Sequence, residues 1–139
     1  MKSDQYYLAE LEDKILEVVY NQTKDIPRPW GLILSGGFDS GLLAALTKPD
    51  YVYSISFPYG PKYDEGRYRD AIIKHLDIKK VHIITFKKED FLPNLKEGVR
   101  VVGEPISHFS LAPFNLLMKT IGEVSNSNVL SGEGPDEYL

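Results

Sequence analysis

Cysteine is absent from the 139-residue sequence, and histidine and tryptophan are scarce. Without cysteine the sequence offers no disulfide, no thiolate ligand for zinc and no cysteine nucleophile. Its three histidines, His75, His82 and His108, do not follow the spacing of a metal site. We therefore expect core or surface roles for the histidines, and a chemistry that relies on neither thiols nor zinc.

The sequence also lacks long apolar runs and an excess of positive charge. No apolar segment approaches the ~20 residues of a membrane-spanning helix, and residues 1–14 are too polar and acidic for a signal peptide. The 16 Lys and Arg residues against 20 Asp and Glu give a formal net charge of −4. This balance argues against a general nucleic-acid binder. We expect a cytoplasmic protein with neither nucleic acid nor a membrane as a partner.

The composition is otherwise ordinary for a globular protein, with 42% hydrophobic and 26% charged residues. A chain of this length forms one domain and can bury a sizeable core. We expect a single domain over residues 1–139, without internal repeats or linkers. Residues 1–27 are expected to form an amino-terminal docking helix and its connection, because Leu8, Leu11 and Ile15 recur at helical spacing.

Apolar, β-branched segments alternate with helical patterns along the rest of the sequence. The expected strands are residues 31–35, 51–57, 81–86 and 128–131. The expected helices are residues 40–47, 64–77, 88–102 with a break near Pro93, and 110–124. This alternation predicts an α/β fold, a doubly wound parallel sheet with helices on both faces. The strand order that we expect for it is 3-2-1-4. Such sheets bind ligands at the carboxyl ends of their strands, where the winding direction reverses.

The segment SGGFDS, residues 35–40, follows the first expected strand and leads into a helix. A turn of small residues at the start of a helix offers backbone N–H groups to a phosphate. The adjacent Gly36 and Gly37 allow the backbone to approach an anion closely. Asp39 adds a carboxylate, which Mg²⁺ needs and bare anion binding does not. The segment therefore predicts a nucleotide phosphate site; a glycine-rich turn without a ligand is the alternative.

An acidic segment, residues 132–137, follows the last expected strand. With strand order 3-2-1-4, the first and last strands are neighbours and the loops after them meet. This topology would bring Asp39 and Asp136 to one crevice. The alternatives are that Asp136 and Glu137 form a solvated acidic end and that Glu133 is an ordinary surface residue.

SGGFDS resembles the pyrophosphate loop of the ATP-pyrophosphatase (PP-loop) enzymes. Within that superfamily, the sequence resembles the synthetase domain of asparagine synthetases, which is related to the β-lactam synthetases. The other similar motifs are YSISF at residues 53–57, YDE at 63–65, GEP at 103–105 and LSGEGPDE at 130–137. Asp64 within YDE stands where a helix cap is expected, so we expect it to have a structural role.

The resemblance implies an adenine nucleotide α-hydrolase-like fold and a ligase that uses ATP and Mg²⁺. Such enzymes activate a carboxylate, aspartate or another acid, as an acyl-adenylate, release pyrophosphate and form an amide with ammonia. By resemblance, Asp39 and Asp136 hold Mg²⁺, and Glu133 is the catalytic residue that assists the nitrogen nucleophile. The residues implied at the β- and γ-phosphates are Ser35, Gly36, Gly37, Asp39 and Ser40; those at adenine are Ile33 and Phe57, and those near the ribose or α-phosphate are Ser131 and Gly132.

Three departures from the family leave a second interpretation open. The sequence has no glutaminase domain, so nitrogen would come from ammonia in solution or from another chain. Phe109 stands where an arginine would grip aspartate, which favours a more apolar acid. The sequence also ends soon after Asp136, before the Gly-Gly-Tyr segment, the helices and the lysine of the family. A non-catalytic or partial ATP/AMP-binding module is therefore the alternative function, and the partners to consider are a glutaminase, a completing subunit and a second copy of the chain.

Overall fold

The computed structural model describes residues 4–60, 62–105, 108–125 and 128–133 of the chain. Four strands are present in this part of the chain: β1 (Trp30–Ile33), β2 (Tyr51–Ser56), β3 (Val81–Thr85) and β4 (Asn128–Leu130). Five helices accompany them: α1 (Asp4–Thr23), α2 (Phe38–Thr47), α3 (Gly66–His75), α4 (Lys88–Val102) and α5 (Leu111–Val124). The expected alternation of strands and helices is confirmed.

The strands form one parallel sheet in the order β3-β2-β1-β4, which confirms the predicted topology. β1 is central, and its Gly31 pairs in register with Tyr51 on one side and Val129 on the other. Glycine is required at this position because a side chain would come within 2.5 Å of the Tyr53 ring. The chain reverses its winding direction at β1, so the loops after β1 and β4 open at the same edge of the sheet.

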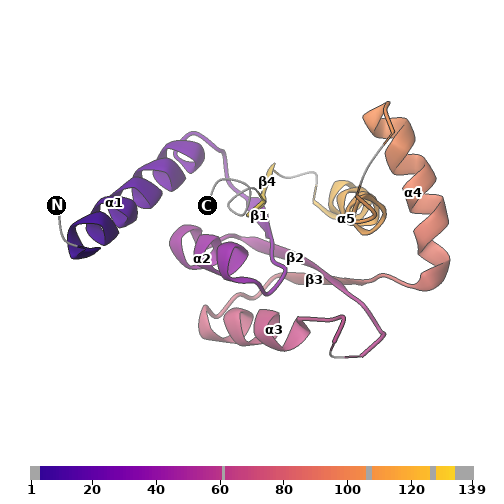
Figure 1. Ribbon diagram of the computed structural model, residues 1–139, viewed down its shortest axis with the longest axis horizontal. Helices are drawn as coiled ribbons and strands as arrows, with labels where there is room; N and C mark the ends of the chain where they lie inside the picture. The colour runs from indigo at the N-terminus through magenta and orange to yellow at the C-terminus, as the bar shows by residue number, and fades with distance from the viewer. Residues whose placement is uncertain (1–3, 61, 106–107, 126–127, 134–139) are drawn as a thin grey trace.

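Each face of the sheet is covered by its own apolar core, as a doubly wound fold requires. On one face Leu32, Leu34 and Val52 are fully buried and pack against α2 and α3 (Figure 1). On the other face Tyr53 packs against Leu117 of α5. Full burial of each such aliphatic or aromatic side chain stabilises the fold by roughly 1.5–3 kcal/mol. Neighbouring strand residues point to opposite faces, which is why this sheet needs helices on both.

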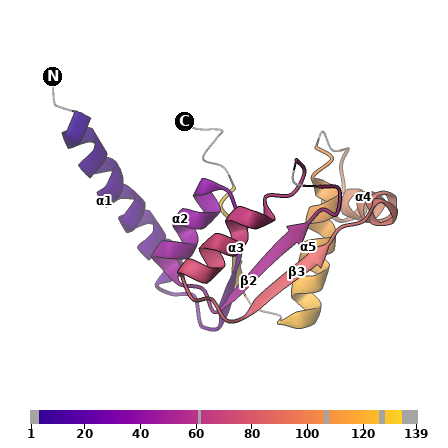
Figure 2. The ribbon, with the colours of Figure 1, turned by 90° about the horizontal axis from the view of Figure 1, so that it is seen from below.

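α4 packs on α5, and the two helices cross steeply. Figure 1 shows α5 end-on and α4 lengthwise, whereas Figure 2 shows the reverse. A side chain at Gly98 would come within 2.7 Å of Leu111, so the helices touch closely at this point. The Asn115 side chain donates a hydrogen bond to Asn94 Oδ1 between the same helices. The expected break near Pro93 is wrong: α4 runs unbroken through it, because the ring removes only one hydrogen bond near the start of the helix.

α1 projects from the body of the molecule, with its amino-terminal end farthest away (Figures 1 and 2). It is helical, as expected, but none of its residues is buried. Its main contacts are with α2 rather than with the sheet. Since α2 already covers that side of β1, α1 reaches only the outer surface of α2. Within the described residues, no helix combines the length and the apolar character needed to cross a membrane.

Candidate functional site

The loop after β1 is held in shape by its own two serines. The hydroxyl oxygens of Ser35 and Ser40 lie 3.0 Å apart, and Ser40 Oγ also accepts a hydrogen bond from the Ser35 backbone. The backbone N–H of Gly37 donates to Ser35 Oγ over 3.1 Å. Ser40 is only 6% exposed. Its hydroxyl therefore shapes the loop, whatever contact it also makes with a ligand.

α2 begins inside this loop, and no side chain caps it. The helix starts at Phe38 rather than at the expected residue 40. The N–H groups of a first helical turn have no partner within the helix, and they carry the positive end of its dipole. Asp39 places a carboxylate in the same turn. The start of α2 can thus bind an anion through backbone N–H groups and a cation through Asp39.

Gly36 allows the loop to touch the start of α3. Its φ of 104° lies in the left-handed region that glycine favours. A side chain there would also come within 2.9 Å of the Glu65 carbonyl oxygen and 3.0 Å of the Arg69 backbone nitrogen. The loop is therefore fixed between the first turns of α2 and α3.

The loop after β4 reaches the start of α2 from another side. A side chain at Gly132 would lie 3.1 Å from the backbone nitrogen of Ser40 and 3.3 Å from the carbonyl carbon of Asp39. The pairing of β1 with β4 brings the two loops together, as the predicted topology requires. The predicted approach of Asp136 to Asp39 lies outside the described residues.

A small cavity of about 160 Å³ opens where these two loops meet. Its lining residues are Ile33, Ser35, Gly37, Asp39, Ser40, Phe114, Ser131, Gly132 and Glu133. All of them except Phe114 were singled out from the sequence. The cavity is small and lies at an uncapped helix start, which suits a phosphate or pyrophosphate group.

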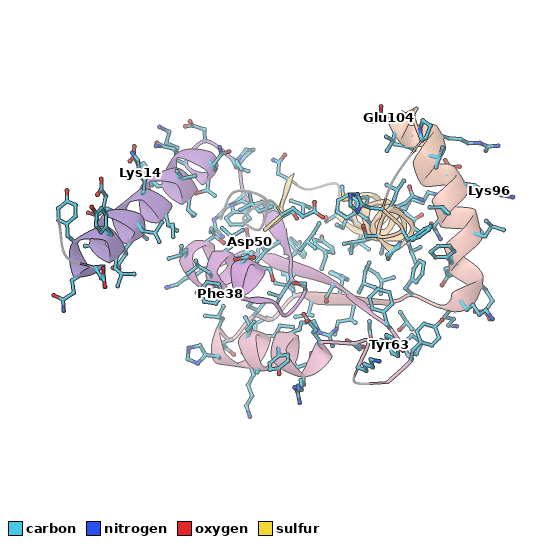
Figure 3. The ribbon with its side chains drawn as sticks, viewed as in Figure 1. Lys14, Phe38, Asp50, Tyr63, Lys96 and Glu104 are labelled. Carbon is cyan, nitrogen blue, oxygen red and sulfur yellow. The ribbon has the colours of Figure 1, made fainter. Side chains whose placement is uncertain are left out.

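A larger cavity of about 760 Å³ adjoins the small one, and the two share Ile33, Ser35, Phe114 and Glu133. Its volume lies in the usual range for small-molecule sites. Phe57, at the end of β2, lines the large cavity together with Ile33, so the two residues predicted to flank adenine come together. Other parts of the wall come from the loop after β2 and from the connection between α4 and α5. Figure 3 labels one residue of each segment, Tyr63 and Glu104, and the two residues lie far apart in that view.

Charged side chains at the large cavity are mainly acidic. Its acidic lining residues are Asp64, Glu65, Glu104 and Glu133, whereas Lys62 is the one lysine or arginine among its described lining residues. Glu133 lies on the boundary between the two cavities and is exposed to both. A carboxylate at this boundary can act on a group held between the two cavities.

Phe109 does not line either cavity, contrary to its expected place at the substrate. It is 74% exposed, and its ring lies against that of Phe91 with a centroid separation of 6.2 Å. His108 and Ser110, on either side of it, line the large cavity instead. The turn before α5 directs these neighbours inward, and Phe109 packs on the start of α4.

Asp64 ties the end of β2 to the start of α3. One of its carboxylate oxygens accepts hydrogen bonds from the Ser56 hydroxyl and the Phe57 N–H, over 2.5 and 3.2 Å. The other accepts one from the Gly66 N–H over 2.8 Å. The Ser56 bond is the largest cause that holds the pKa of Asp64 below its ordinary value; burial opposes it, and the two backbone bonds and the charge of Arg69 add to it. These contacts confirm a structural role for Asp64, but the N-cap of α3 is Glu65 and not Asp64 as expected.

Phe114 and Arg69 were not predicted from the sequence as residues near the site. Phe114 belongs to the inward stripe of α5 with Leu117 and Ile121, so helical spacing could have identified it. Arg69 had no such signal, because an arginine within a helical pattern is typically solvated. In the structure it is only 5% exposed.

The small cavity offers oxygen ligands that suit Mg²⁺. In nucleotide sites this ion is typically held by one or two carboxylates together with phosphate oxygens. Asp39 supplies a carboxylate at the cavity wall. Among the residues that the structure describes, no group of three or more His, Cys, Asp or Glu side chains could hold a metal by itself. The lining thus fits a metal bound jointly with a nucleotide.

Comparison with known families matches the chain to the family model described as asparagine synthase, over residues 10–139. The matched range contains the sheet, both loops and all residues that line the two cavities. Comparison with curated proteins gives no match.

Proposed function

The chain belongs to the asparagine synthase family of ATP-dependent ligases, and from this premise we propose that it activates a carboxylic acid for amide formation. In the proposed reaction the carboxylate of aspartate or another acid attacks the α-phosphorus of ATP. The bond to the β-phosphate breaks, giving an acyl-adenylate and pyrophosphate. Ammonia then attacks the acyl carbon, and AMP leaves as the amide forms.

The observation that carries this proposal is the pair of adjoining cavities that share Ile33, Ser35, Phe114 and Glu133. The small cavity lies at the start of α2 and suits the leaving pyrophosphate. The large cavity has an apolar wall and suits the nucleoside and the acid. The atoms that react would then lie at the boundary, where the two cavities meet.

The phosphate end of ATP is proposed to lie on the first turn of α2. The residues proposed to cradle the β- and γ-phosphates are Ser35, Gly36, Gly37, Asp39 and Ser40. Backbone N–H groups and a helix dipole stabilise the charge that develops on the leaving pyrophosphate. Asp39 would hold Mg²⁺, which neutralises part of that charge, and Asp136 is proposed as its second ligand.

The nucleoside end of ATP is proposed to lie in the large cavity. Ile33 and Phe57 would flank adenine, since both line its apolar wall. Ser131 and Gly132 line the small cavity beside the first turn of α2. They would therefore lie near the ribose or the α-phosphate.

Glu133 is proposed to assist the second half-reaction. Its exposed carboxylate lies at the boundary of the two cavities. From there it can orient ammonia and accept the proton that the nitrogen loses after it attacks the acyl carbon. We propose that the ammonia comes from solution or from a glutaminase subunit. A completing subunit, or a second copy of the chain, is proposed to enclose the site, and the cytoplasm is the proposed location.

Pyrophosphate release tests the proposal. The chain is incubated with ATP, Mg²⁺, ammonium and one acid at a time from a panel of amino acids and other carboxylic acids. One acid is expected to stimulate the release of pyrophosphate and AMP together. Asp39→Asn is expected to lower the rate by about 100-fold or more, because the charge on the leaving group is no longer met. Asp77→Asn, which changes an exposed aspartate between α3 and β3, is the matched control and should keep the rate.

The same experiment separates the alternative function. The described lining of the large cavity holds no arginine that could grip an acid, which favours an ATP- or AMP-binding module without turnover. Tight ATP binding that Asp39→Asn abolishes, with no pyrophosphate released for any acid, would establish that alternative and refute the ligase.

A further inference from the structure

Arg69 is a buried cation in the first turns of α3. The residue is 5% exposed, and its Nε donates to Asp70 Oδ1 over 2.9 Å. Its Nη1 atom is buried and has no hydrogen-bond partner among the described residues. A buried donor without a partner is destabilising. The fold therefore retains an unsatisfied guanidinium at this place.

The position of the guanidinium adds to this cost. A side chain at Gly66 would come within 2.9 Å of Arg69 Nη2, so the guanidinium folds back over the residue at which α3 begins. The amino-terminal end of a helix carries a partial positive charge and disfavours cations. An apolar residue of similar size would avoid both penalties. The ion pair with Asp70 satisfies Nε and leaves the buried Nη1 without a partner among the described residues.

The same turn of α3 touches the loop proposed to bind phosphate. A side chain at Gly36 would lie 3.0 Å from the Arg69 backbone nitrogen and 2.9 Å from the Glu65 carbonyl oxygen. Arg69 itself does not line either cavity. It would therefore act on a bound ligand through its charge and not through direct contact.

Asp64 lies near this guanidinium as well, because a side chain at Gly66 would come within 2.9 Å of Arg69 Nη2 and within 3.0 Å of Asp64 Oδ1. Its carboxylate is fixed by Ser56, Phe57 and Gly66, and the positive charge of Arg69 favours its ionised form. Without Arg69, an uncompensated negative charge would remain beside the loop, where it would repel a polyanion. Buried or partly buried charges are screened by salt much less than exposed ones.

We propose that Arg69 is a positioning residue for the nucleotide: it neutralises Asp64 and so keeps the loop at Gly36 able to accept pyrophosphate. The inference rests on the proposed function, because it takes this loop as the phosphate site. It assigns Arg69 an electrostatic effect on the phosphate end of ATP and none on the nucleoside end. A purely structural arginine would affect both ends alike.

The test measures the binding of Mg²⁺-pyrophosphate and of adenosine separately by isothermal titration calorimetry, with thermal unfolding as a check on the fold. Arg69→Met is expected to weaken pyrophosphate binding at least tenfold and to leave adenosine binding within twofold. Arg69→Lys, which keeps the charge, should recover most of the loss. Arg67→Met is the matched control: it removes a cation from the same turn, but one that is exposed over the Tyr68 ring, and both affinities should stay within twofold.

A double variant separates charge from structure. In Arg69→Met with Asp64→Asn the uncompensated carboxylate is gone, so pyrophosphate binding should improve on that of Arg69→Met alone. If Arg69→Met does not fold, Arg69→Gln, which removes the charge but keeps a hydrogen-bond donor, takes its place in both comparisons. Equal loss of both ligands, unchanged pyrophosphate binding in Arg69→Met, or no recovery in the double variant overturns the proposal. A wild-type chain that binds no pyrophosphate overturns the phosphate site itself, and this inference with it.

Discussion

Gly132 lies so close to the backbone nitrogen of Ser40 that a side chain at residue 132 would come within 3.1 Å of it. The two residues are distant in sequence and meet because β4 pairs with β1. One belongs to the loop after β4 and the other to the first turn of α2. This contact sets the width of the small cavity, which Gly132 and Ser40 both line.

Gly132→Ala is therefore expected to weaken ATP binding. The new methyl group meets backbone atoms of Asp39 and Ser40 that cannot move without disturbing the start of α2. We expect a loss of tenfold or more in affinity, about 1.4 kcal/mol or above, measured by isothermal titration calorimetry. Unchanged affinity would mean that this contact does not shape the ligand site.

Gly122→Ala is the matched control for that variant. Gly122 lies within α5, and a side chain there would meet no atom of the described residues within 4 Å. Alanine has a higher helix propensity than glycine, so the free energy of unfolding should increase by about 0.5–1 kcal/mol. The variant should therefore unfold at a higher temperature than the wild type. Its ATP affinity should equal that of the wild type.

Gly36→Ala is expected to lower the free energy of unfolding through two effects at once. Its φ of 104° strains any L-residue, and the methyl group would come within 2.9 Å of the Glu65 carbonyl oxygen. We expect a loss of about 2–3 kcal/mol in urea denaturation. Gly60→Ala isolates the first effect. Gly60 has a φ of 95°, and within the described part of the chain no atom outside its neighbouring residues lies within 4 Å of the new side chain. The free energy of unfolding of that control should fall by only about 1–2 kcal/mol. Equal losses in the two variants would show that the contact between Gly36 and α3 does not contribute to stability.

Ser56→Ala is expected to make the protein more sensitive to acid. The folded pKa of Asp64 is lowered, chiefly by the Ser56 hydrogen bond, so its contribution to stability is present above the unfolded value of about 3.9 and is lost as the pH falls through the folded pKa. Without Ser56 that folded pKa rises, and the loss begins at a higher pH. Circular dichroism during acid titration should show the unfolding midpoint moving upward.

Two further variants check the cause of that shift. Ser110→Ala changes an exposed serine whose side chain does not cap α5, and its acid midpoint should match the wild type. In an Asp64→Asn background, Ser56→Ala should no longer move the midpoint. A shift that persists there would assign the effect to another group.

The sequence contained enough to predict the sheet and most of the small cavity. The alternation of strands and helices predicted a parallel sheet, and the expected order β3-β2-β1-β4, which the structure confirms, makes the loops after β1 and β4 neighbours. Glycines in motifs report on close backbone contacts, and the contact of Gly132 with α2 is of this kind. The glycines of the two motifs, together with the expected strand order, therefore predicted that the loops after β1 and β4 meet.

Features that depend on side-chain direction could not be predicted in this way. Phe109 was expected at the substrate, but its ring packs on Phe91, and its neighbours His108 and Ser110 line the large cavity instead. The burial of Arg69 follows from the way α3 meets the loop at Gly36, which no local pattern records. The apolar spacing of α1 predicted a helix, but spacing does not say which surface a helix meets.

Glu133→Gln is expected to separate the two half-reactions of the proposed ligase. Adenylate formation relies on the start of α2 and on Asp39, so the release of pyrophosphate in a single turnover should stay near the wild-type rate. Amide formation should fall by about 100-fold or more, because a glutamine cannot accept the proton from the attacking nitrogen. Rapid-quench measurements of pyrophosphate and amide follow the two steps independently. Glu89→Gln changes an exposed carboxylate in the first turn of α4 that lines neither cavity, and it should leave amide formation unchanged. If Glu133→Gln slows pyrophosphate release as much as amide formation, the proposed role is wrong. Glu133 would then act on the nucleotide during adenylate formation and not on the attacking nitrogen.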